Sequence, residues 1–380
     1  MGSIIYIFKI ILYFVIVLLI YFLLRHDYYQ NNFKFSLTIT RMKLFLKKQL
    51  VKTKISNFKI ILISVIFGCY SVYVSAKPYF ADRAYYAIAY GNRVYDYQMP
   101  KLFLSLTKFL FNIDSNPDFL FFSVSFLIIF IIFIAYKKFE NANYYGFLLL
   151  AFSLFFIFDF HMLKQGLAVA FGTLFLIYLL KKKYIIAVIW LLVSINFHES
   201  ALILIPIGIL LIGSANRIIR FLGYSLFFFI PFCFSGFSNS MSSIMMEIFP
   251  SFGSEFKTYF SNLSFSASNI AASIKGLPFY IITFFGLTQR KKYVNLVPNY
   301  DKYMYLSIFV SLSYIISSYM YWMFRFSFFG YFLVCMFFGS VIKFIENKKQ
   351  KFLYVTMVYG STFIITLRYL IQMFFLHGGF

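Results

Sequence analysis

The chain has 380 residues, of which 62% are hydrophobic and 12% charged, and its mean hydropathy is +0.81. Soluble globular proteins are about 45–50% apolar and about 25% charged, so this composition excludes a disordered chain and an ordinary soluble domain. The net charge of +23 would suggest nucleic acid as a partner of a soluble protein, but in a membrane protein its meaning depends on which loops carry the cations. The sequence therefore predicts a polytopic membrane protein.

Apolar runs separated by charged or polar breaks predict a single all-α transmembrane bundle of about 12 spans, with a range of about 10–13. The expected spans are residues 3–24, 58–75, 118–136, 144–160, 165–180, 184–197, 199–213, 221–238, 277–289, 304–322, 327–343 and 352–375. The first run is too long for the core of a signal peptide and has no obvious cleavage site, so we expect it to be a retained helix. The cysteines show neither disulfide nor metal-site spacing.

Lysine and arginine fall mainly on alternate breaks between these spans. If residues 25–59 are cytoplasmic, 24 of the 35 basic residues lie on inside breaks, as the positive-inside rule expects. Residues 25–59 are then a basic loop, part of which we expect on the anionic inner leaflet. Residues 76–117 and 238–276 are expected on the outer, periplasmic face, where function should reside.

The first outer segment is rich in tyrosine and charge. A helix of 100° per residue would place a carboxylate, an arginine and three tyrosines on one arc: Asp82, Tyr86, Tyr90, Arg93 and Tyr97. Arg83 borders this arc. Aromatic faces pack on sugar C–H groups and arginine binds phosphate with two hydrogen bonds, so the stripe suits sugar recognition. The alternative is an aromatic belt at the membrane interface, and Gly91 would interrupt the helix.

A second candidate lies at the start of the expected span 165–180. Because this span would run inward, its first N–H groups and the positive end of its dipole would point outward, where anions bind. Lys164 and Gln165 at this end are expected to hold a diphosphate, with His161 one turn earlier. The alternative is a cation among the lipid headgroups.

The short expected spans 184–197 and 199–213 meet at His198. Helices this short cross a bilayer if their junction is recessed, so His198 is expected in a protein-lined cavity. A neutral imidazole there suits a general base for a sugar hydroxyl, and the alternative is a hydrogen-bonded link between helices. Asn196, with Glu199 three residues later, is typical of a helix N-cap with its reciprocal partner.

Arg325 is the only charged residue between Met304 and Val341. Charges inside membranes are retained mostly at functional positions or beside a partner of opposite charge, although an arginine at a hairpin tip can also extend to the headgroups. Arg368 in the last span is a weaker case of the same kind. The sequence contains no nucleotide-binding loop, dinucleotide fingerprint, hydrolase elbow or zinc-protease motif, and its carboxylates are too scattered to suggest a metal site.

Several of these elements occur in an order that resembles the EpsG-like branch of the Wzy-type O-antigen polysaccharide polymerases. The resembling segments are Asp82-x-x-x-Tyr86 with Tyr90, residues 99–103, Lys164-Gln165, residues 197–202 and Arg325-Phe326. Residues 197–202, similar to a Phe-His-x-Ser-Ala-Leu motif, are the most specific. Two features depart from the family: its usual arginine is Lys164 here, and the glutamate before Pro100 is missing.

The resemblance implies a GT-C-like glycosyltransferase of the bacterial inner membrane, with its active face on the periplasmic side and neither metal nor cofactor. The enzyme would transfer a growing glycan from undecaprenyl diphosphate to the non-reducing-end hydroxyl of an undecaprenyl-diphosphate-linked repeat unit, in surface polysaccharide or lipopolysaccharide synthesis. Its partners would be the lipid-linked oligosaccharide as donor and acceptor, membrane lipid and a chain-length regulator, without nucleic acid.

In that reaction we expect His198, Asp82 and Arg325 to be catalytic, with His198 or Asp82 as the base. Arg83, Lys164 and Arg325 would hold the diphosphate. The other expected substrate contacts are Tyr86, Tyr90, Arg93, His161 and Gln165.

Two other functions remain open at this point. A lipid-linked oligosaccharide flippase should show an internal repeat, and no convincing self-similarity between the halves is found. A membrane O-acyltransferase would need a histidine reached from the cytoplasm, whereas His161, His198 and His377 map outside.

Overall fold

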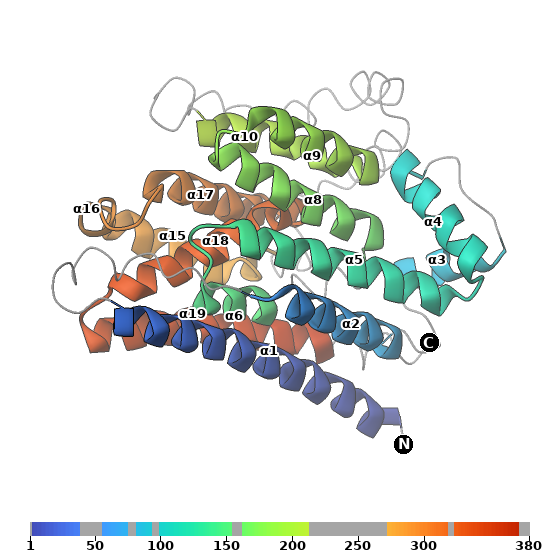
Figure 1. Cartoon of the computed structure of the whole chain (residues 1–380), viewed down its shortest axis with the longest axis horizontal. Coiled ribbons are helices and arrows are strands. Elements are labelled where there is room, and N and C mark those ends of the chain that lie inside the picture. The colour runs from blue at the N-terminus through green and yellow to red at the C-terminus, as the bar shows by residue number, and fades with distance from the viewer. Residues whose placement is uncertain are drawn as a thin grey trace.

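The computed structural model of the chain describes residues 2–38, 55–74, 81–92, 99–153, 162–212, 272–317 and 323–371; within them, the side chains of residues 2–6, 26–38, 74, 81 and 82 are not described. This part of the chain is helical and contains no strand. Most of the longer helices lie side by side along one direction (Figure 1). The predicted all-α fold is therefore confirmed for the described residues.

The helices follow the predicted runs closely. The first eight described helices are α1 (Gly2–Thr38), α2 (Asn57–Val74), α3 (Ala81–Gly91), α4 (Lys101–Ile113), α5 (Pro117–Lys138), α6 (Tyr144–Phe152), α8 (Leu163–Leu180) and α9 (Tyr184–Phe197). The remaining described helices are the 3₁₀ helix η2 (Glu199–Ile203), α10 (Leu204–Ile212), α15 (Leu277–Thr288), α16 (Arg290–Tyr293), α17 (Tyr300–Ile316), α18 (Phe324–Phe344) and α19 (Lys348–Ile371).

Some of the described helices are long and apolar enough to cross a membrane. Five stretches meet this criterion: Ile7–Arg25, Pro117–Lys138, Leu163–Leu180, Phe324–Phe344 and Lys348–Ile371. Four shorter apolar stretches accompany them: Asn57–Tyr73, Tyr184–Phe197, Glu199–Ile212 and Leu277–Thr288. The expected span 221–238 and most of the expected outer loop 238–276 lie outside the described residues. The chain is thus a membrane protein, and the number of twelve spans stays a prediction.

Two helix ends differ from the expected ones. α1 continues to Thr38, past the expected end at Leu24, because residues 25–38 contain neither proline nor glycine. The first part of the basic loop 25–59 is therefore helical. α6 ends at Phe152, before the expected end at residue 160, since Ser153 becomes extended and its hydroxyl donates to the Leu150 carbonyl at 2.6 Å.

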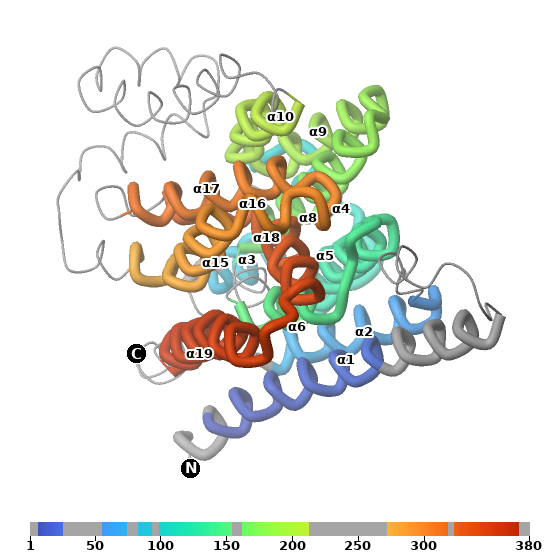
Figure 2. The backbone as a smooth tube through the Cα atoms, turned by 90° about the vertical axis from the view of Figure 1, so that its left-hand side faces the viewer, coloured from blue at the N-terminus to red at the C-terminus, as the bar shows by residue number. Residues whose placement is uncertain are grey.

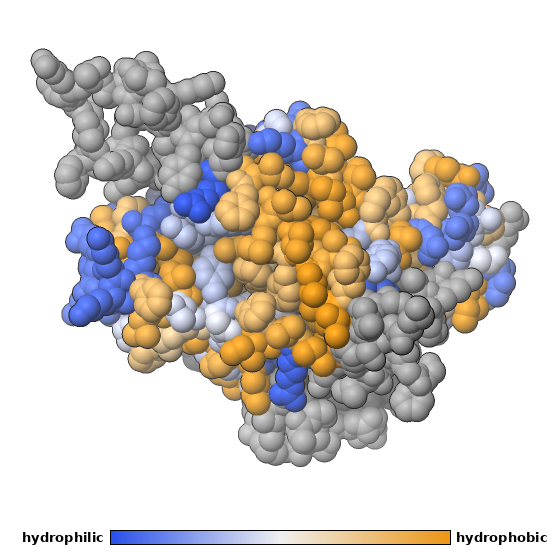
Figure 3. Space-filling model, turned by 90° about the horizontal axis from the view of Figure 1, so that it is seen from below, coloured by the Kyte–Doolittle hydropathy of each residue, from blue (hydrophilic) through white to orange (hydrophobic). Residues whose placement is uncertain are grey.

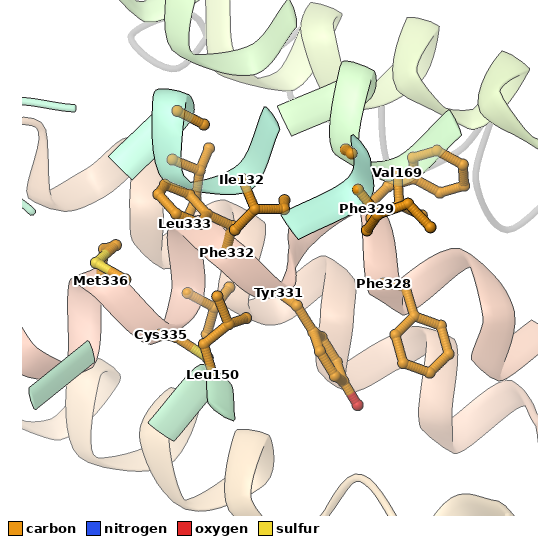
Figure 4. Close-up of a cluster of buried hydrophobic side chains, with 14 of the residues drawn as sticks. Ile132, Leu150, Val169, Phe328, Phe329, Tyr331, Phe332, Leu333, Cys335 and Met336 are labelled. Atoms are coloured by element: carbon orange, nitrogen blue, oxygen red, sulfur yellow. The ribbon is translucent and has the colours of Figure 1, made fainter. Parts of the chain in front are cut away.

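α18 is the central helix of the bundle. It packs against α6, α8 and α17 and is buried along almost its whole length (Figure 2). Figure 4 shows Phe329 of α18 beside Val169 of α8, and Cys335 of α18 beside Leu150 of α6. A helix that is buried all round has to be apolar all round, which explains the phenylalanine-rich run and leaves Arg325 at its first turn as an exception.

Glycines allow α6 to approach α18 closely. A Cβ atom at Gly146 would lie 2.5 Å from the Cys335 carbonyl oxygen. The Asn143 side chain caps α6 by accepting the Gly146 N–H at 2.7 Å, and its Nδ2 donates to the Met336 carbonyl at 3.0 Å. Small residues and buried amides are typical of helix contacts in membranes, and here they fix the centre of the bundle.

The breaks that follow α5, α8 and α18, and the short helix α16, lie at one end of the bundle, at the left of Figure 1; because these segments carry lysine and arginine, we call it the basic end. Lys181 Nζ donates to the Lys138 carbonyl at 2.6 Å, and Lys182 and Lys302 line one cavity. On the face seen in Figure 3, apolar residues form a broad band across the middle, with hydrophilic residues toward the ends. The alternating charge pattern of the sequence predicts that these breaks lie on the same side of the membrane.

Candidate functional site

α8 and α9 are held close together, which positions the residues that follow α9. Ser194 Oγ donates to the Ala168 carbonyl at 2.6 Å, and the rings of Phe171 and Phe197 stack at 5.2 Å. A Cβ atom at Gly172 would lie 2.8 Å from Leu204 Cδ1. Because α8 carries small residues on this face, the end of α9 lies beside the first turns of α8.

His198 links α9 to η2. It is extended, with φ −162° and ψ 127°, and its Nδ1 accepts the Ser200 N–H at 3.1 Å. His198 is thus the N-cap of η2. The predicted cap at Asn196 is wrong, because Asn196 lies in the last turn of α9 and its Nδ2 donates to the Leu192 carbonyl at 2.8 Å.

Two cations from other helices lie near His198: Lys164 in the first turn of α8 and Arg325 in the first turn of α18. Burial, and then the charges of Lys164 and Arg325, lower the pKa of His198 to about 3. The imidazole is therefore neutral, and since Nδ1 accepts a hydrogen bond, the ring proton is assigned to Nε2. In this state His198 is a hydrogen-bond donor through Nε2–H.

Gln165 connects the two helix starts. It is 1% exposed, and its Nε2 donates to the Arg325 carbonyl at 3.3 Å. The N-termini of α8 and α18 therefore meet here, and each contributes the positive end of a helix dipole. Together with Lys164 and Arg325 they make this part of the protein strongly attractive to an anion.

Two buried polar atoms beside these groups lack a hydrogen-bond partner among the described residues, namely Gln165 Oε1 and Ser200 Oγ. An unpartnered buried polar atom costs about 1–3 kcal/mol, so folded proteins seldom keep one without a reason. A polar ligand held near Lys164 and Arg325 would supply partners for both atoms. We call these five residues the candidate site: Lys164, Gln165, His198, Ser200 and Arg325.

The tertiary structure thus brings together four of the residues predicted from sequence, from three separate segments. Ser200 was not among the predicted residues, although its place two residues after His198 in the recognised motif could have singled it out. The sequence does not show whether a serine hydroxyl is buried or whether it has a hydrogen-bond partner.

The predicted tyrosine-rich arc begins on α3, and only part of it is described. α3 ends at Gly91, so the helix does not extend to Arg93 and Tyr97, which lie outside the described residues. Tyr86 is buried with its ring 5.6 Å from that of Phe103, and the Tyr90 hydroxyl donates to the Asp114 carbonyl at 2.6 Å.

Arg83 is buried between α2, α3 and α5. Its Nη1 and Nη2 donate to the carbonyl and hydroxyl oxygens of Ser71 at 3.0 and 2.7 Å, and its guanidinium lies 4.7 Å from the centre of the Phe121 ring. The side chain of Asp82 and the whole of His161 are outside the described parts of the chain. The proposed roles of these residues in substrate binding stay predictions.

A model of the EpsG family matches residues 79–377, a range that includes α3, α19 and the whole candidate site. No curated protein and no solved structure matches the chain.

Proposed function

The chain belongs to the EpsG family, and on this premise we propose that it is a membrane glycosyltransferase that polymerises a bacterial surface polysaccharide such as O-antigen. It transfers a growing glycan from undecaprenyl diphosphate to the non-reducing-end hydroxyl of an undecaprenyl-diphosphate-linked repeat unit. The observation that carries this proposal is the convergence of Lys164, His198 and Arg325, beside unpartnered buried polar atoms of Gln165 and Ser200.

The site chemistry fits a diphosphate leaving group. When the sugar–phosphate bond breaks, negative charge develops on the departing diphosphate. Lys164 and Arg325, with the positive ends of α8 and α18, stabilise that charge without a metal ion. These groups are fixed by helix packing before substrate arrives, so little reorganisation is needed during the reaction.

In the transfer step, the acceptor hydroxyl oxygen bonds to the anomeric carbon of the donor, and the bond from that carbon to the diphosphate oxygen breaks. Undecaprenyl diphosphate leaves, and the hydroxyl proton passes to a base, for which the sequence offers His198 or Asp82. His198 Nδ1 accepts the Ser200 N–H, which favours His198 as a donor from Nε2–H and Asp82 as the base.

A bound diphosphate would also change the titration of His198. The charges of Lys164 and Arg325 lower its pKa, and an anion between them would offset that effect and raise the pKa again. Binding of the donor would thus make His198 a better proton acceptor, if Nδ1 releases the Ser200 N–H during the reaction.

The membrane orientation follows from charge. If the basic end faces the cytoplasm, as the positive-inside rule expects, the N-termini of α8 and α18 open toward the periplasm. The candidate site then lies at the outer leaflet of the inner membrane, where lipid-linked repeat units are presented. This orientation agrees with a polymerase that acts after its substrates have crossed the membrane.

The function is tested by deleting the gene, restoring it, and separating the surface glycan by gel electrophoresis. We expect the deletion strain to display single repeat units and the restored strain to display long chains. A deletion strain that loses all surface glycan and accumulates lipid-linked units facing the cytoplasm would instead identify a flippase and overturn the proposal.

A further inference from the structure

A second cationic cluster lies beside the start of α18. Lys275 precedes α15, and its Nζ lies over the rings of Phe324 and Tyr369, 5.1 Å from the centre of each. Phe324 directly precedes Arg325, and Tyr369 directly follows Arg368 on α19. Lys275 therefore joins the start of α18 to the last turn of α19, and it contacts the residue that precedes Arg325 of the candidate site.

The turn that carries Lys275 is fixed by its packing. A Cβ atom at Gly276 would lie 2.5 Å from Tyr314 Cβ, so the backbone presses directly against α17. The Tyr280 hydroxyl donates to the Ser273 carbonyl at 2.9 Å and thereby ties the turn to α15. The position of the Lys275 ammonium group is therefore set by the fold, unlike that of a flexible surface lysine.

Lys275 and Arg368 are like charges in one neighbourhood, because the Lys275 Nζ lies over the ring of Tyr369, the residue that follows Arg368. Burial, and then the charge of Arg368, lower the pKa of Lys275 to about 8. Two neighbouring cations repel each other, whereas an anion held between them is stabilised by both. Exposed apolar side chains accompany each cation along the chain, Leu277 after Lys275 and Ile371 after Arg368. This combination suits a headgroup that carries phosphate and is attached to a hydrocarbon chain.

We propose that Lys275 and Arg368 form a second anion site, which binds the diphosphate of the second lipid-linked substrate while Lys164 and Arg325 bind that of the first. This inference rests on the proposed polymerase function. Donor and acceptor are both lipid diphosphates in that reaction, and their headgroups stay apart because the sugars of a repeat unit separate the acceptor hydroxyl from its own diphosphate. Two neighbouring but distinct anion sites satisfy this geometry.

Binding stoichiometry tests the proposal. Full-length protein in phosphatidylcholine nanodiscs is titrated with a fluorescent polyprenyl diphosphate, and the bound probe is counted per protein. We expect about two probes on the wild type, and about tenfold or more weaker binding of one of them in Lys275→Gln/Arg368→Gln, since charge-assisted hydrogen bonds are lost. Lys348→Gln/Lys349→Gln is the matched control, because it removes two exposed cations from the other end of α19.

The outcomes separate this proposal from the polymerase function. If Lys275→Gln/Arg368→Gln still binds both probes with wild-type affinity, the second site is overturned and the polymerase proposal stands. If the wild type binds no probe, both are overturned. Lys275→Arg keeps the charge and should keep the second probe. Continued binding of the first probe by the double variant shows that its loss of the second is not caused by misfolding.

Anionic phospholipid offers the same phosphate chemistry, so the titration is repeated in nanodiscs that contain phosphatidylglycerol. Retention of the second probe in these nanodiscs supports a site for the lipid-linked substrate. Its displacement would assign the pair to bulk membrane lipid and overturn the proposal.

Discussion

Two arginines near the start of a helix, Arg83 and Arg325, lie in contrasting surroundings. Arg83 is 1% exposed and donates twice to Ser71, which in turn accepts from Ser125 Oγ at 2.7 Å. Arg325 is partly exposed, and beside it Gln165 Oε1 is buried without a partner. From the sequence both were expected to hold the diphosphate, although Arg83 lies in a segment rich in charge and Arg325 in an apolar run.

The contrast indicates how a membrane protein uses buried charge. Around Arg83 the protein supplies hydrogen bonds and an aromatic face, so the charge contributes to packing α3 on α2 and α5. Beside Arg325, the buried atoms Gln165 Oε1 and Ser200 Oγ have no described partner and can pair with another molecule. Substitution of Arg83 should therefore lower stability, and substitution of Arg325 should lower activity.

The largest expected effect is on activity at Arg325. Arg325→Gln should lower the polymerisation rate about 10²–10³-fold, because the variant loses a charge that stabilises the leaving diphosphate. Thermal unfolding of the variant is measured alongside, so that a loss of activity is separated from a loss of folding. Glycan length on gels, normalised to protein level, measures the effect, and Lys291→Gln at the basic end is the control. Wild-type glycan from Arg325→Gln would remove this residue from the site.

A pair of substitutions at His198 separates its roles. Asparagine keeps an acceptor near the position of Nδ1 for the Ser200 N–H, but it loses the Nε2–H donor. The His198→Asn variant should therefore fold normally, and its polymerisation rate should be about 10²-fold lower. Gln keeps an N–H near the Nε2 position but loses the cap, so His198→Gln should lose about 1 kcal/mol of stability and retain more activity.

These His198 variants are compared by polymer yield and thermal unfolding in the same membranes. An active His198→Asn would reduce the histidine to a helix cap. Equal and complete inactivity of both variants, with both folded, would instead favour His198 as the proton acceptor.

Substitution of Arg83 should have the reverse pattern. Arg83→Gln should destabilise the protein by about 2–4 kcal/mol, because it breaks two buried hydrogen bonds and removes the cation from the Phe121 ring. Activity per folded molecule should fall far less than in Arg325→Gln. Thermal unfolding measures the loss of stability, and specific activity measures the loss of activity per folded molecule. A stable Arg83→Gln protein without activity would show that Arg83 binds substrate, as its place in the sequence suggested.

The smallest expected effect is at Gln165. Gln165→Met has a similar volume; it removes a buried oxygen that has no described partner but also the Nε2 hydrogen bond to the Arg325 carbonyl, so the two effects offset and stability should change by less than about 1 kcal/mol. Activity should fall about tenfold, since the amide is lost as a ligand for the substrate. A variant that is both less stable and fully active would mean that Gln165 serves only to join α8 to α18.

Much of the fold could be predicted because membrane helices are determined by local composition. The apolar runs located α2, α5, α8, α9, α15 and α18 to within a few residues. The ends of α1 and α6 were missed, because a helix end depends on capping and tertiary contact as well as on polarity. The burial of Tyr86 against Phe103 was not predicted, since hydrophobic periodicity shows which residues share a helix face but not which helix covers that face.

The sequence by itself determined that the chain is an α-helical membrane protein, since 62% hydrophobic residues in runs of this length satisfy their backbone hydrogen bonds in lipid only as helices. It also determined that His198, Lys164 and Arg325 were unusual residues in such a setting. Only the tertiary structure decided that these three meet, that Arg83 is paired within the protein, and that Lys275 lies beside Arg368. The physical reason is that polarity is a property of each segment, whereas hydrogen-bond partners come from helix packing between residues far apart in the chain.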